Sequence, residues 1–493
     1  MSTNKQPRLQ VSEYLQKYDI QKLLEEGINA LYTNQSENPE DFLAQFFAQR
    51  TKKSNITKIR ARQILDSRGN PTVEVDVYCG DKLAGRASAP SGASTGSNEA
   101  RELRDGGEKF MGKAVSKAVE NVNTTIAEVL KGKDVLHLKE CDQAMLDKDG
   151  TNLKENLGGN AITATSFAIA AAGANIANEE LFIYLAKQFY GREDVSDKKF
   201  ALPTPMVNIL NGGKHAGGKL KIQEFMIVPR SDILFSEQLR QVSEVYHHLG
   251  KLLAQEKGAG ATNVGDEGGF APPLNTPDEA LNIIEKAIGN AGYKVGEDIF
   301  LALDCAASEF YDKDTQKYEA IEKKKFSSDE MVEFYEKMVK DHPAMVSIED
   351  PLDEKDYEGW AKMTARLGDR VQIVGDDLYT TNVKYIKEGI EKKWANALLL
   401  KVNQIGAISE AMDAARLVFE AKQNVIVSHR SGETMTTLIS DLAVATNSKY
   451  IKTGATARGE RVSKYNRLLQ IEEYLKDKGL LRVRTEDDEN NEE

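Results

Sequence analysis

Cysteine is scarce in this chain of 493 residues. The three cysteines are Cys79, Cys141 and Cys305, which lie far apart and form no CxxC pair. An odd number of widely spaced cysteines argues against a disulfide framework and against a structural zinc site. The pattern favours a reducing compartment instead.

Basic residues and long hydrophobic runs are also in short supply. The 65 lysines and arginines are outnumbered by 77 acids, so the formal net charge is −12. Binding to nucleic acid requires a concentrated basic surface, and we expect no such partner. The most apolar stretch, 161–177, is interrupted by Thr, Ser, Gly and Asn. It predicts a packed, Ala-rich helix rather than a membrane span.

The sequence begins MSTNKQPRLQ, which lacks the apolar core of a secretory signal. We therefore expect a cytoplasmic protein with no membrane partner. The length exceeds what one ordinary core accommodates and predicts several domains. By pattern, 1–55 is a small helical module with a linker, 56–195 is an α+β domain, and 196–484 alternates strands with helices. The acidic end, 485–493, is typical of disorder.

The second segment begins with strand signals. Lys58–Leu65 and Thr72–Tyr78 alternate between apolar and polar residues, and a run of turn formers, 66–71, separates them. The pattern predicts a β-hairpin. From about Asn98 to Val129 the spacing becomes helical. A sheet followed by helices is an α+β arrangement.

The third segment contains six short apolar runs, each ending in a polar residue. These residues, 23 to 45 positions apart, are Asp304, Glu349, Asp376, Lys401, His429 and Lys452. Each interval can hold one strand–loop–helix–loop unit. Polar groups at the carboxyl ends of consecutive parallel strands form the active site of a (β/α)₈ barrel. Any one of them could be an ordinary strand end facing water, but six in register predict a barrel with a polar site.

Three of these residues, Asp304, Glu349 and Asp376, are carboxylates. If their strands are neighbours, the acids converge and repel one another unless a cation or protons are bound. A set of oxygen ligands suits a hard ion such as Mg²⁺. Spacing alone leaves open that they are separate surface acids.

Lys401 and Lys452 end two further strands. A buried lysine near other cations has a lowered pKa and can act as a base. Each could equally pair with one of the three acids, and the sequence pattern does not separate these readings.

Several loops have the composition of ligand-binding segments. They are 91–96 (a candidate lid), 211–218 followed by Gln223 and Glu224, 265–269, and 429–434. Glycine allows close approach of the backbone to a ligand, and Arg430 suits a phosphate or carboxylate. None has the spacing of a P-loop or of a dinucleotide fingerprint. A glycine-rich loop can also be only a turn.

Ten segments together resemble the enolase family in order and spacing, over residues 56 to about 475. They are DSRGNPTVEV (66–75), PSGASTG (90–96), NGGKHAGGKLKIQEFMIVP (211–229), NVGDEGGFAP (263–272), ALDCAASEFY (302–311), SIEDPLDE (347–354), GDDL (375–378), LLLKVNQIG (398–406), SHRSGET (428–434) and IKTGATARGER (451–461). The resemblance implies an α/β protein with an α+β N-terminal domain and an enolase-type (β/α)₈ TIM-like barrel. It also implies a homodimer.

The implied activity is phosphopyruvate hydratase, a carbon–oxygen lyase. It would interconvert 2-phosphoglycerate and phosphoenolpyruvate in glycolysis and gluconeogenesis, with two Mg²⁺ per active site. The implied metal ligands are Asp304, Glu349, Asp376 and, for the second ion, Ser94.

The resemblance also assigns catalytic roles. Lys401 is the implied general base and Glu267 the general acid, with Glu224 beside it and His215 over the substrate. The implied substrate-binding set is Ser94, His215, Glu224, Glu349, Asp376, Lys401, His429, Arg430, Ser431 and Lys452.

Departures from the family pattern do not touch a catalytic position. They include Thr456, Gly459, Met435 and the segment 158–167. The intact site favours an active enzyme over an inactive enolase-fold docking protein of a ciliary or cytoskeletal assembly. The loops at 90–96, 265–269 and 428–434 argue against a related enzyme, such as a racemase, that acts on another carboxylate.

The first segment lies outside the enolase resemblance. Helical apolar faces run over 20–31 and 42–47, and Asn38 and Pro39 have the pattern of an N-cap and first helical residue. Residues 14–50 resemble the dimerisation/docking domains of protein kinase A regulatory subunits. That resemblance implies a dimer that binds an amphipathic helix of a scaffold protein, in a ciliary or axonemal setting. The alternative is a helical hairpin packed on the enolase body.

Overall fold

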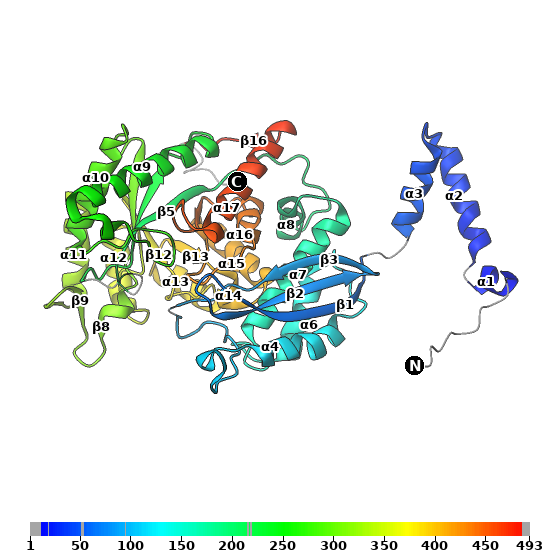
Figure 1. Cartoon of the computed structure of the whole chain (residues 1–493), viewed down its shortest axis with the longest axis horizontal. Coiled ribbons are helices and arrows are strands. Elements are labelled where there is room, and N and C mark those ends of the chain that lie inside the picture. The colour runs from blue at the N-terminus through cyan, green and yellow to red at the C-terminus, as the bar shows by residue number, and fades with distance from the viewer. Residues whose placement is uncertain are drawn as a thin grey trace. The chain divides into compact units, whose positions relative to one another are not determined.

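The structure is a computed structural model that describes residues 11–17, 19–50, 54–93, 95–213, 216 and 219–485. It forms two compact units, Met1–Asn55 and Ile56–Glu493 (Figure 1). The expected acidic tail lies outside the described residues from position 486 onward.

The N-terminal unit is helical. It contains α1 (Val11–Lys17), α2 (Ile20–Asn34) and α3 (Pro39–Arg50). The predicted start of α3 is confirmed, because the Asn38 side chain accepts a hydrogen bond from the Asp41 amide at 3.3 Å. Helices α2 and α3 meet at Gly27, where an added Cβ would lie 2.8 Å from the Phe47 ring. Gly27 therefore permits the close approach of the two helices.

The second unit begins with an antiparallel three-stranded sheet. It is formed by β1 (Ile56–Leu65), β2 (Pro71–Cys79) and β3 (Lys82–Ser88) in that order. The predicted hairpin is confirmed, with Leu65 opposite Pro71. Asp66 closes its turn by accepting hydrogen bonds from the Arg68 and Asn70 amides.

The predicted helix over 98–129 is wrong in its first half. Helical structure starts only at α4 (Ser116–Asn121) and continues through a π-helical turn (Val122–Ile126) into α5 (Ala127–Leu130), with an isolated 3₁₀ turn (Lys109–Gly112) before it. Gly106 and Gly107 have positive φ, which interrupts a helix. Ala100 donates its amide hydrogen to Gln404 of the barrel, so its backbone pairs outside the segment.

The α7 helix forms the centre of the α+β part. The predicted Ala-rich helix is confirmed as α7 (Gly159–Ala177), which is almost wholly buried against β2 and β3. It is flanked by α6 (Leu138–Asp149) and α8 (Leu181–Tyr190). Figure 1 shows the sheet lying across α7 and α6. Within the described residues, no helix combines the length and apolar composition that crossing a membrane requires.

Eight strands close into a barrel. In barrel order they are β11 (Met345–Glu349), β12 (Gln372–Gly375), β13 (Ala397–Leu400), β14 (Asn424–Ser428), β15 (Tyr450–Lys452), β5 (Thr204–Asn211), β6 (Glu224–Pro229) and β7 (Ile299–Asp304). β6 is antiparallel to both of its neighbours, and the other neighbouring pairs are parallel. The predicted fold, a TIM-like barrel behind an α+β domain, is confirmed.

Helices connect and cover the barrel strands. They are α9 (Phe235–Lys257), α10 (Pro277–Asn290), α11 (Ser328–Asp341), α12 (Tyr357–Leu367), α13 (Val383–Lys392), α14 (Val402–Ile405), α15 (Ile408–Glu420), α16 (Leu438–Ala445) and α17 (Gly459–Asp477). A small sheet follows β7, made of β8 (Tyr311–Asp312), β9 (Lys317–Ile321) and β10 (Lys324–Phe326), and β4 (Phe200–Ala201) pairs with β16 (Leu481–Arg482).

The barrel strands are buried on both faces. Leu398 and Leu400 of β13 belong to the main core, whereas Leu399 belongs to a second cluster made mostly of barrel-strand residues. Successive side chains on a strand point to opposite faces, so the second cluster fills the barrel and the first packs under the helices. The charged residues of these strands lie at the strand ends, whereas Asn208 of β5 and Ser347 of β11 are uncharged polar residues buried within their strands.

Candidate active site

The six predicted strand-end residues meet at one end of the barrel. Asp304, Glu349 and Lys452 are the last residues of β7, β11 and β15. The other three, Asp376, Lys401 and His429, directly follow β12, β13 and β14. Five of them line one pocket with Glu224, Glu267, Arg430 and Ser431, and the sixth, Glu349, contacts Lys452 of that lining. The expectation that these strands bring polar groups together is confirmed.

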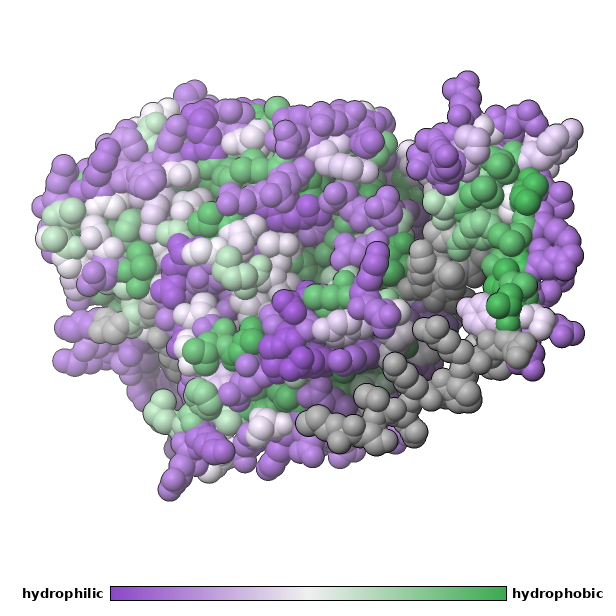
Figure 2. Space-filling model, turned by 45° about the vertical axis from the view of Figure 1, so that its right-hand side comes forward, coloured by the Kyte–Doolittle hydropathy of each residue, from purple (hydrophilic) through white to green (hydrophobic). Residues whose placement is uncertain are grey.

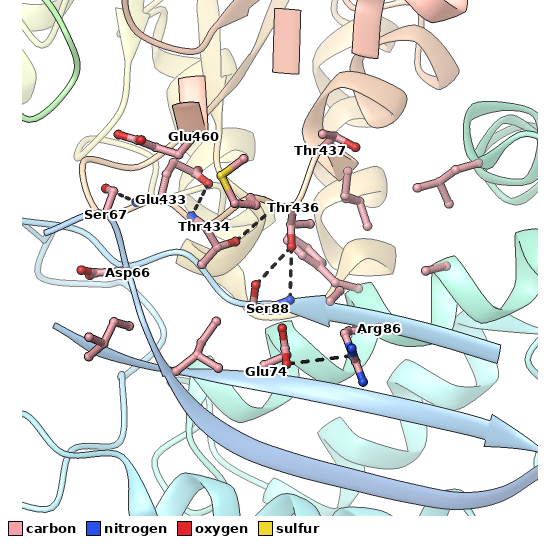
Figure 3. Close-up of a pocket in the computed structure, with 18 residues that line it drawn as sticks. Asp66, Ser67, Glu74, Arg86, Ser88, Glu433, Thr434, Thr436, Thr437 and Glu460 are labelled. Atoms are coloured by element: carbon pink, nitrogen blue, oxygen red, sulfur yellow. Dashed lines mark hydrogen bonds and ion pairs between the residues drawn. The ribbon is translucent and has the colours of Figure 1, made fainter. Parts of the chain in front are cut away.

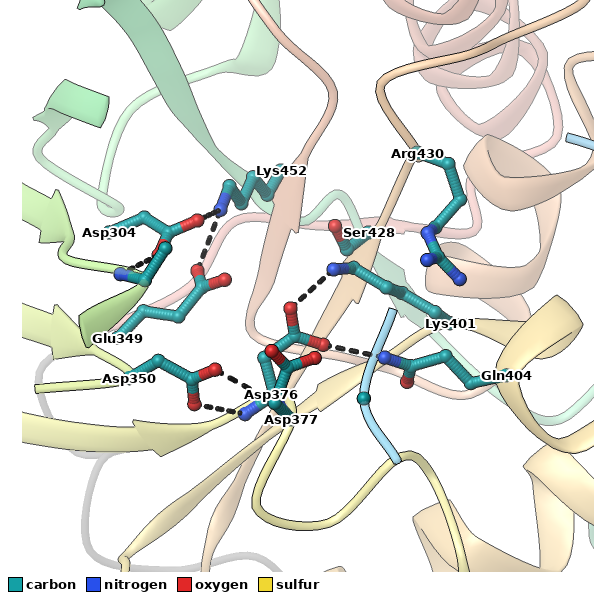
Figure 4. Close-up of polar contacts among 12 residues, drawn as sticks. Asp304, Glu349, Asp350, Asp376, Asp377, Lys401, Gln404, Ser428, Arg430 and Lys452 are labelled. Atoms are coloured by element: carbon teal, nitrogen blue, oxygen red, sulfur yellow. Dashed lines mark hydrogen bonds and ion pairs between the residues drawn. The ribbon is translucent and has the colours of Figure 1, made fainter. Parts of the chain in front are cut away.

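Lys452 lies among the acids at the β15 end. Its ammonium donates to Asp304 at 2.9 Å and to Glu349 at 2.8 Å, as Figure 4 shows. Glu224 lies 3.4 Å from the same ammonium group. Lys452 is 2% exposed, so these contacts are shielded from water. A buried ammonium requires such partners, and three carboxylates supply them.

Burial governs how these acids ionise. It raises the pKa of Glu224 well above its usual value, and the nearby Glu267 carboxylate adds to the effect. Burial and then Asp304 similarly raise the pKa of Glu349. Burial also acts to raise the pKa of Asp304, but Lys452 together with Lys401 outweighs burial and lowers it. The cluster holds excess negative charge, which favours uptake of a proton or a cation.

Lys401 pairs with Asp376 in the neighbouring part of the pocket. Its ammonium donates to one oxygen of Asp376 at 2.5 Å, and Gln404 donates to the other at 2.7 Å. Burial lowers the pKa of Lys401, but the nearby acids, Asp376 first and then Glu349, together outweigh burial, so the pKa lies above its usual value. The chain's own charges thus keep Lys401 protonated.

Asp350 and Asp377 extend the acidic region beyond the predicted ligands. Ligand oxygens of Asp350, Asp376 and Asp377 all lie within 4.8 Å of one another. Asp350 accepts hydrogen bonds from the Asp376 and Asp377 amides at 2.9 and 3.0 Å (Figure 4). Our sequence reasoning missed both residues, although each directly follows a predicted ligand. Their position directly after a predicted ligand was the sequence feature that could have identified them.

The donor set fits a hard divalent cation. Glu349 has one buried oxygen without a hydrogen-bond partner in the part of the chain that the structure describes. The nearby acids offer only oxygen atoms, which Mg²⁺ prefers to nitrogen or sulfur. Charge excess and an unsatisfied carboxylate oxygen are the features expected of protein groups that hold such an ion.

Glu267 lies on a different wall of the pocket. The Asn208 side chain donates to one of its oxygens at 3.0 Å, and His429 Nε2 lies 3.4 Å from that oxygen. Both Glu267 and His429 are nearly inaccessible to solvent. Burial lowers the pKa of His429 to about 4. At neutral pH the imidazole is therefore uncharged.

Arg430 forms a buried ion pair with Glu99, which lies three residues beyond the candidate lid and accepts a hydrogen bond from the Gly96 amide. Arg430 donates to both oxygens of Glu99, at 2.8 and 3.2 Å. The Ser91 and Gly432 backbones exchange hydrogen bonds of 2.7 and 2.9 Å. These contacts hold the base of the 91–96 loop against the 429–434 loop. Sequence reasoning missed Glu99, because nothing local in the sequence indicates that it contacts Arg430.

Two predicted site residues, Ser94 and His215, lie outside the described residues. Of the described residues near them in the sequence, Ala93 lines the pocket, and the Gly213 carbonyl accepts a hydrogen bond from the Ala216 amide. The expected roles of Ser94 and His215 stay predictions.

Models of two enolase domains match the chain. The model of the enolase N-terminal domain matches residues 56–185, and that of the enolase C-terminal TIM barrel domain matches residues 199–488. The chain belongs to the enolase family. Residues 1–55 precede both matches.

Similar enolases come from distant organisms. The enolase of Corynebacterium kroppenstedtii is 53% identical over 424 residues, which cover 86% of this chain and 96% of that protein. The enolases of Thermococcus gammatolerans and Pyrococcus furiosus are each 52% identical over 420 residues, covering 85% of this chain and 95% of theirs. The predictions of an enolase and of a phosphopyruvate hydratase are confirmed.

Within this enolase, the departures noted in the sequence lie away from the pocket. Gly459 begins α17, and an added Cβ there would meet nothing within 4 Å. Met435 is 64% exposed. None of the three departing residues Met435, Thr456 and Gly459 lines the pocket that contains the strand-end residues.

Proposed function

We propose that the chain catalyses the Mg²⁺-dependent, reversible dehydration of 2-phosphoglycerate to phosphoenolpyruvate in glycolysis and gluconeogenesis. One observation carries the proposal. A single buried pocket is lined by a lysine suited to act as base, a carboxyl suited to act as acid, a cluster of oxygen ligands and an arginine. These are the groups that removal of a proton and a hydroxide from a phosphorylated carboxylate requires.

Asp304, Glu349 and Asp376 are the proposed ligands of one Mg²⁺ ion, and Ser94 is the proposed protein ligand of a second. The unpartnered oxygen of Glu349 supports this assignment. When bound, Mg²⁺ supplies positive charge that offsets Asp376 and stabilises the second negative charge developing on the substrate carboxylate. Lys452 contributes a fixed positive charge beside Asp304 and Glu349.

Lys401 is the proposed general base, which removes the proton from C2. To accept a proton it must first be neutral, and Arg430 and Lys452 both favour the neutral amine. Asp376 holds the Lys401 ammonium group at 2.5 Å and so fixes its position. Preorganisation of this kind reduces the cost of bringing the base to the substrate.

Glu267 is the proposed general acid. Hydroxide is a poor leaving group, so the C3 hydroxyl must be protonated as it departs. The pKa of the neighbouring Glu224 is raised by burial and by Glu267, which supports proton storage on this side of the pocket. His429 and His215 complete the proposed set near the leaving group.

Arg430 and Ser431 are the proposed phosphate contacts. Arg430 is buried and held by Glu99, so its planar guanidinium is fixed before substrate binds. The remaining proposed substrate contacts are Ser94, Glu224, Glu349, Asp376, Lys401 and Lys452. Among them, Arg430, Lys401 and Lys452 give this narrow pocket the positive charge that suits a small anionic substrate.

A direct assay tests the activity. Purified full-length protein with 2-phosphoglycerate and Mg²⁺ should show rising ultraviolet absorbance from phosphoenolpyruvate. Lys401→Ala and a chelator should each abolish the rise, whereas Lys362→Ala, which removes an exposed lysine paired with Asp329, should not. Folded, Mg²⁺-loaded wild-type protein without turnover would refute the proposed function.

We also propose that the enolase body forms a homodimer through the groove shown in Figure 3. The groove, of about 580 Å³, lies between the β1–β3 sheet and the 433–438 segment of the barrel. On its walls, Leu65 is 57% exposed and Met435 is 64% exposed. Exposed apolar side chains beside Glu74 and Arg86 suit burial by a second copy.

The N-terminal unit is proposed to be a dimerisation/docking module. Gly27 is the one residue of α2 that is buried. On the same helix Leu24, Ile28 and Tyr32 are 50%, 60% and 77% exposed, and Figure 2 shows hydrophobic side chains gathered on this unit. A unit this small rarely supplies enough core alone, and pairing into a four-helix bundle would bury that stripe.

A scaffold protein presenting an amphipathic helix is the proposed partner of the paired modules, in a cilium or axoneme. Residues 1–55 expressed alone should sediment as a dimer. A monomer would refute the docking proposal and favour a module that needs the enolase body. In a ciliated cell, the tagged full chain should reach the axoneme, and tagged 56–493 should remain in the cytoplasm.

The proposed domain limits follow these assignments. They are 1–55 for the module and linker, 56–195 for the α+β domain, 196–484 for the barrel and 485–493 for the tail. The division into compact units at 55/56 and the family-model limits of 56–185 and 199–488 support them.

A further inference from the structure

Arg461 contacts both loops that supply the acid side of the pocket. It lies near the start of α17 and is fully buried. One of its terminal nitrogens donates to His429 Nδ1 and to the Arg430 carbonyl, both at 2.7 Å. The other donates to the carbonyls of Asp266 at 3.1 Å and Ser431 at 2.6 Å. One guanidinium thus ties the 265–269 loop to the 429–434 loop.

The contact with His429 has a chemical consequence. A guanidinium has N–H donors and no acceptor. His429 Nδ1 must therefore be the acceptor in the 2.7 Å contact and cannot carry a hydrogen. Because burial, with a contribution from Arg461, lowers the pKa of His429 to about 4, the ring is neutral at pH 7. Its one ring hydrogen is then on Nε2.

The Nε2 atom faces the reacting groups. It is buried, lies 3.4 Å from a Glu267 oxygen, and has no hydrogen-bond partner in the described part of the chain. His429 and Glu267 line the same pocket. Apart from this long contact with Glu267, the buried N–H has no acceptor among the described residues, so it can donate to a closer acceptor that enters the pocket.

We propose that Arg461 is a positioning residue that fixes His429 in the Nε2–H tautomer, so that His429 donates a hydrogen bond beside Glu267 to the departing hydroxyl. The catalytic consequence rests on the proposed function. Arg461 does not itself line the pocket, but it contacts His429, Arg430 and Ser431, which do. Its effect passes through the ring orientation of His429 and through the two backbone carbonyls that it holds.

The tautomer can be measured in the full-length protein. Selective ¹⁵N labelling of the 6 histidines distinguishes a protonated ring nitrogen from a bare one, and His429→Gln identifies the His429 signals. At pH 7 the wild-type protein should show a protonated Nε2 and a bare Nδ1 at His429. A protonated Nδ1, or protonation of both nitrogens, would overturn the proposal whether or not the protein is active.

Variants connect the tautomer to turnover. Arg461→Met removes the donors and should lower kcat by roughly 10- to 100-fold, with KM changed by less than about threefold. Arg461→Lys, which retains a donor, should recover part of kcat and the Nε2–H signal. A folded Arg461→Met protein with wild-type kcat and an unchanged His429 spectrum would overturn the proposal.

Arg467→Met is the matched control. Arg467 lies on the same helix and pairs with Asp441 and Glu180 rather than with the pocket. Its loss should leave kcat and the His429 spectrum unchanged. If Arg461→Met does not fold, the His429 spectrum of the wild type and the kcat of Arg461→Lys test the proposal instead. An inactive wild-type protein with the expected tautomer would refute the proposed function while leaving the tautomer assignment intact.

Discussion

At the scale of single residues, the pocket is a balance of buried charges. Lys452 and Lys401 were each expected to be either a catalytic group or a partner of the acids, and the structure pairs both with acids. The pairing does not exclude catalysis, because the same contacts hold the amines in place. It does mean that the proposed role of Lys401 as a base requires its pKa to fall, which positive charge added near Asp376 would bring about.

Isotope exchange should distinguish the proposed role of Lys401 as base from that of Glu267 as acid. In D₂O, Lys401→Ala should lose exchange of the C2 hydrogen of 2-phosphoglycerate, because no group then removes that proton. Glu267→Gln should lower turnover by about 10²- to 10⁴-fold yet retain exchange at C2, because only the departure of hydroxide is impaired. Nuclear magnetic resonance of the substrate measures both.

The control for this pair is Glu336→Gln, which removes an acid that pairs with Arg366 on the outside of the barrel. It should match the wild type in exchange and turnover. Loss of C2 exchange in Glu267→Gln would contradict the assignment of Lys401 and Glu267 to separate steps.

At the scale of elements, contacts from distant segments decide where regular structure begins. The helical spacing from Asn98 did not yield an α-helix until Ser116, because the intervening backbone pairs with other segments and includes three glycines with positive φ. The β1–β2 hairpin was predicted correctly, since its alternation and its turn residues are local. Local signals succeed where local interactions dominate.

The packing of β3 on α7 depends on Gly85. An added Cβ there would lie 2.2 Å from the Ala168 carbonyl oxygen and 2.5 Å from the Ala172 amide nitrogen. Gly85→Ala should therefore lower the free energy of unfolding by about 1–3 kcal/mol, measured by urea denaturation. Gly289→Ala in α10 is the control, because its Cβ meets nothing within 4 Å. It should be neutral or stabilising by up to about 1 kcal/mol; equal effects at both glycines would refute this account.

The sheet also contains a pH-dependent ion cluster. Burial would raise the pKa of Asp76, but hydrogen bonds from Arg86 and Arg62 outweigh burial and lower it to about 2. A lowered folded-state pKa gives stability that is present above about pH 4 and is lost as the pH falls towards 2. The side chains of Arg62 and Arg86 are 32% and 50% exposed, and solvent therefore weakens the ion pair that each forms with Asp76.

We therefore expect the advantage of the wild type over Asp76→Asn to shrink by about 1–2 kcal/mol between pH 5 and pH 2.5. Urea unfolding at both pH values, at one protein concentration, measures it. Asp329→Asn removes an exposed partner of Lys362 and should show no such change. An advantage that grows as the pH falls would contradict the assigned direction.

At the scale of the whole molecule, the chain combines an enolase body with a helical unit that lies outside the family match. The body alone spans the length covered by its relatives. We expect residues 56–493 to fold and to retain the kcat and KM of the full chain, because no proposed site residue precedes position 94. Loss of activity on truncation would show that the module contributes to the site.

Two separate interfaces predict distinct assembly states. In analytical ultracentrifugation, 56–493 should be a dimer, and Leu65→Asp with Met435→Asp should make it monomeric, since both side chains are exposed in the proposed groove. The same double substitution in the full chain should leave a dimer held by the module. Full-length protein that becomes monomeric would refute dimerisation by residues 1–55.

The sequence by itself determined the barrel, the hairpin, the Ala-rich helix and the order of polar residues at the strand ends. Those features rest on local alternation and on the rule that parallel strands carry their carboxyl ends to one side. The tertiary structure alone decided that Glu99 holds Arg430, that Asp350 supports Asp376, and that Arg461 contacts His429. Such partners lie 26 to 331 positions apart, and only folding brings them within the few ångströms over which a hydrogen bond acts.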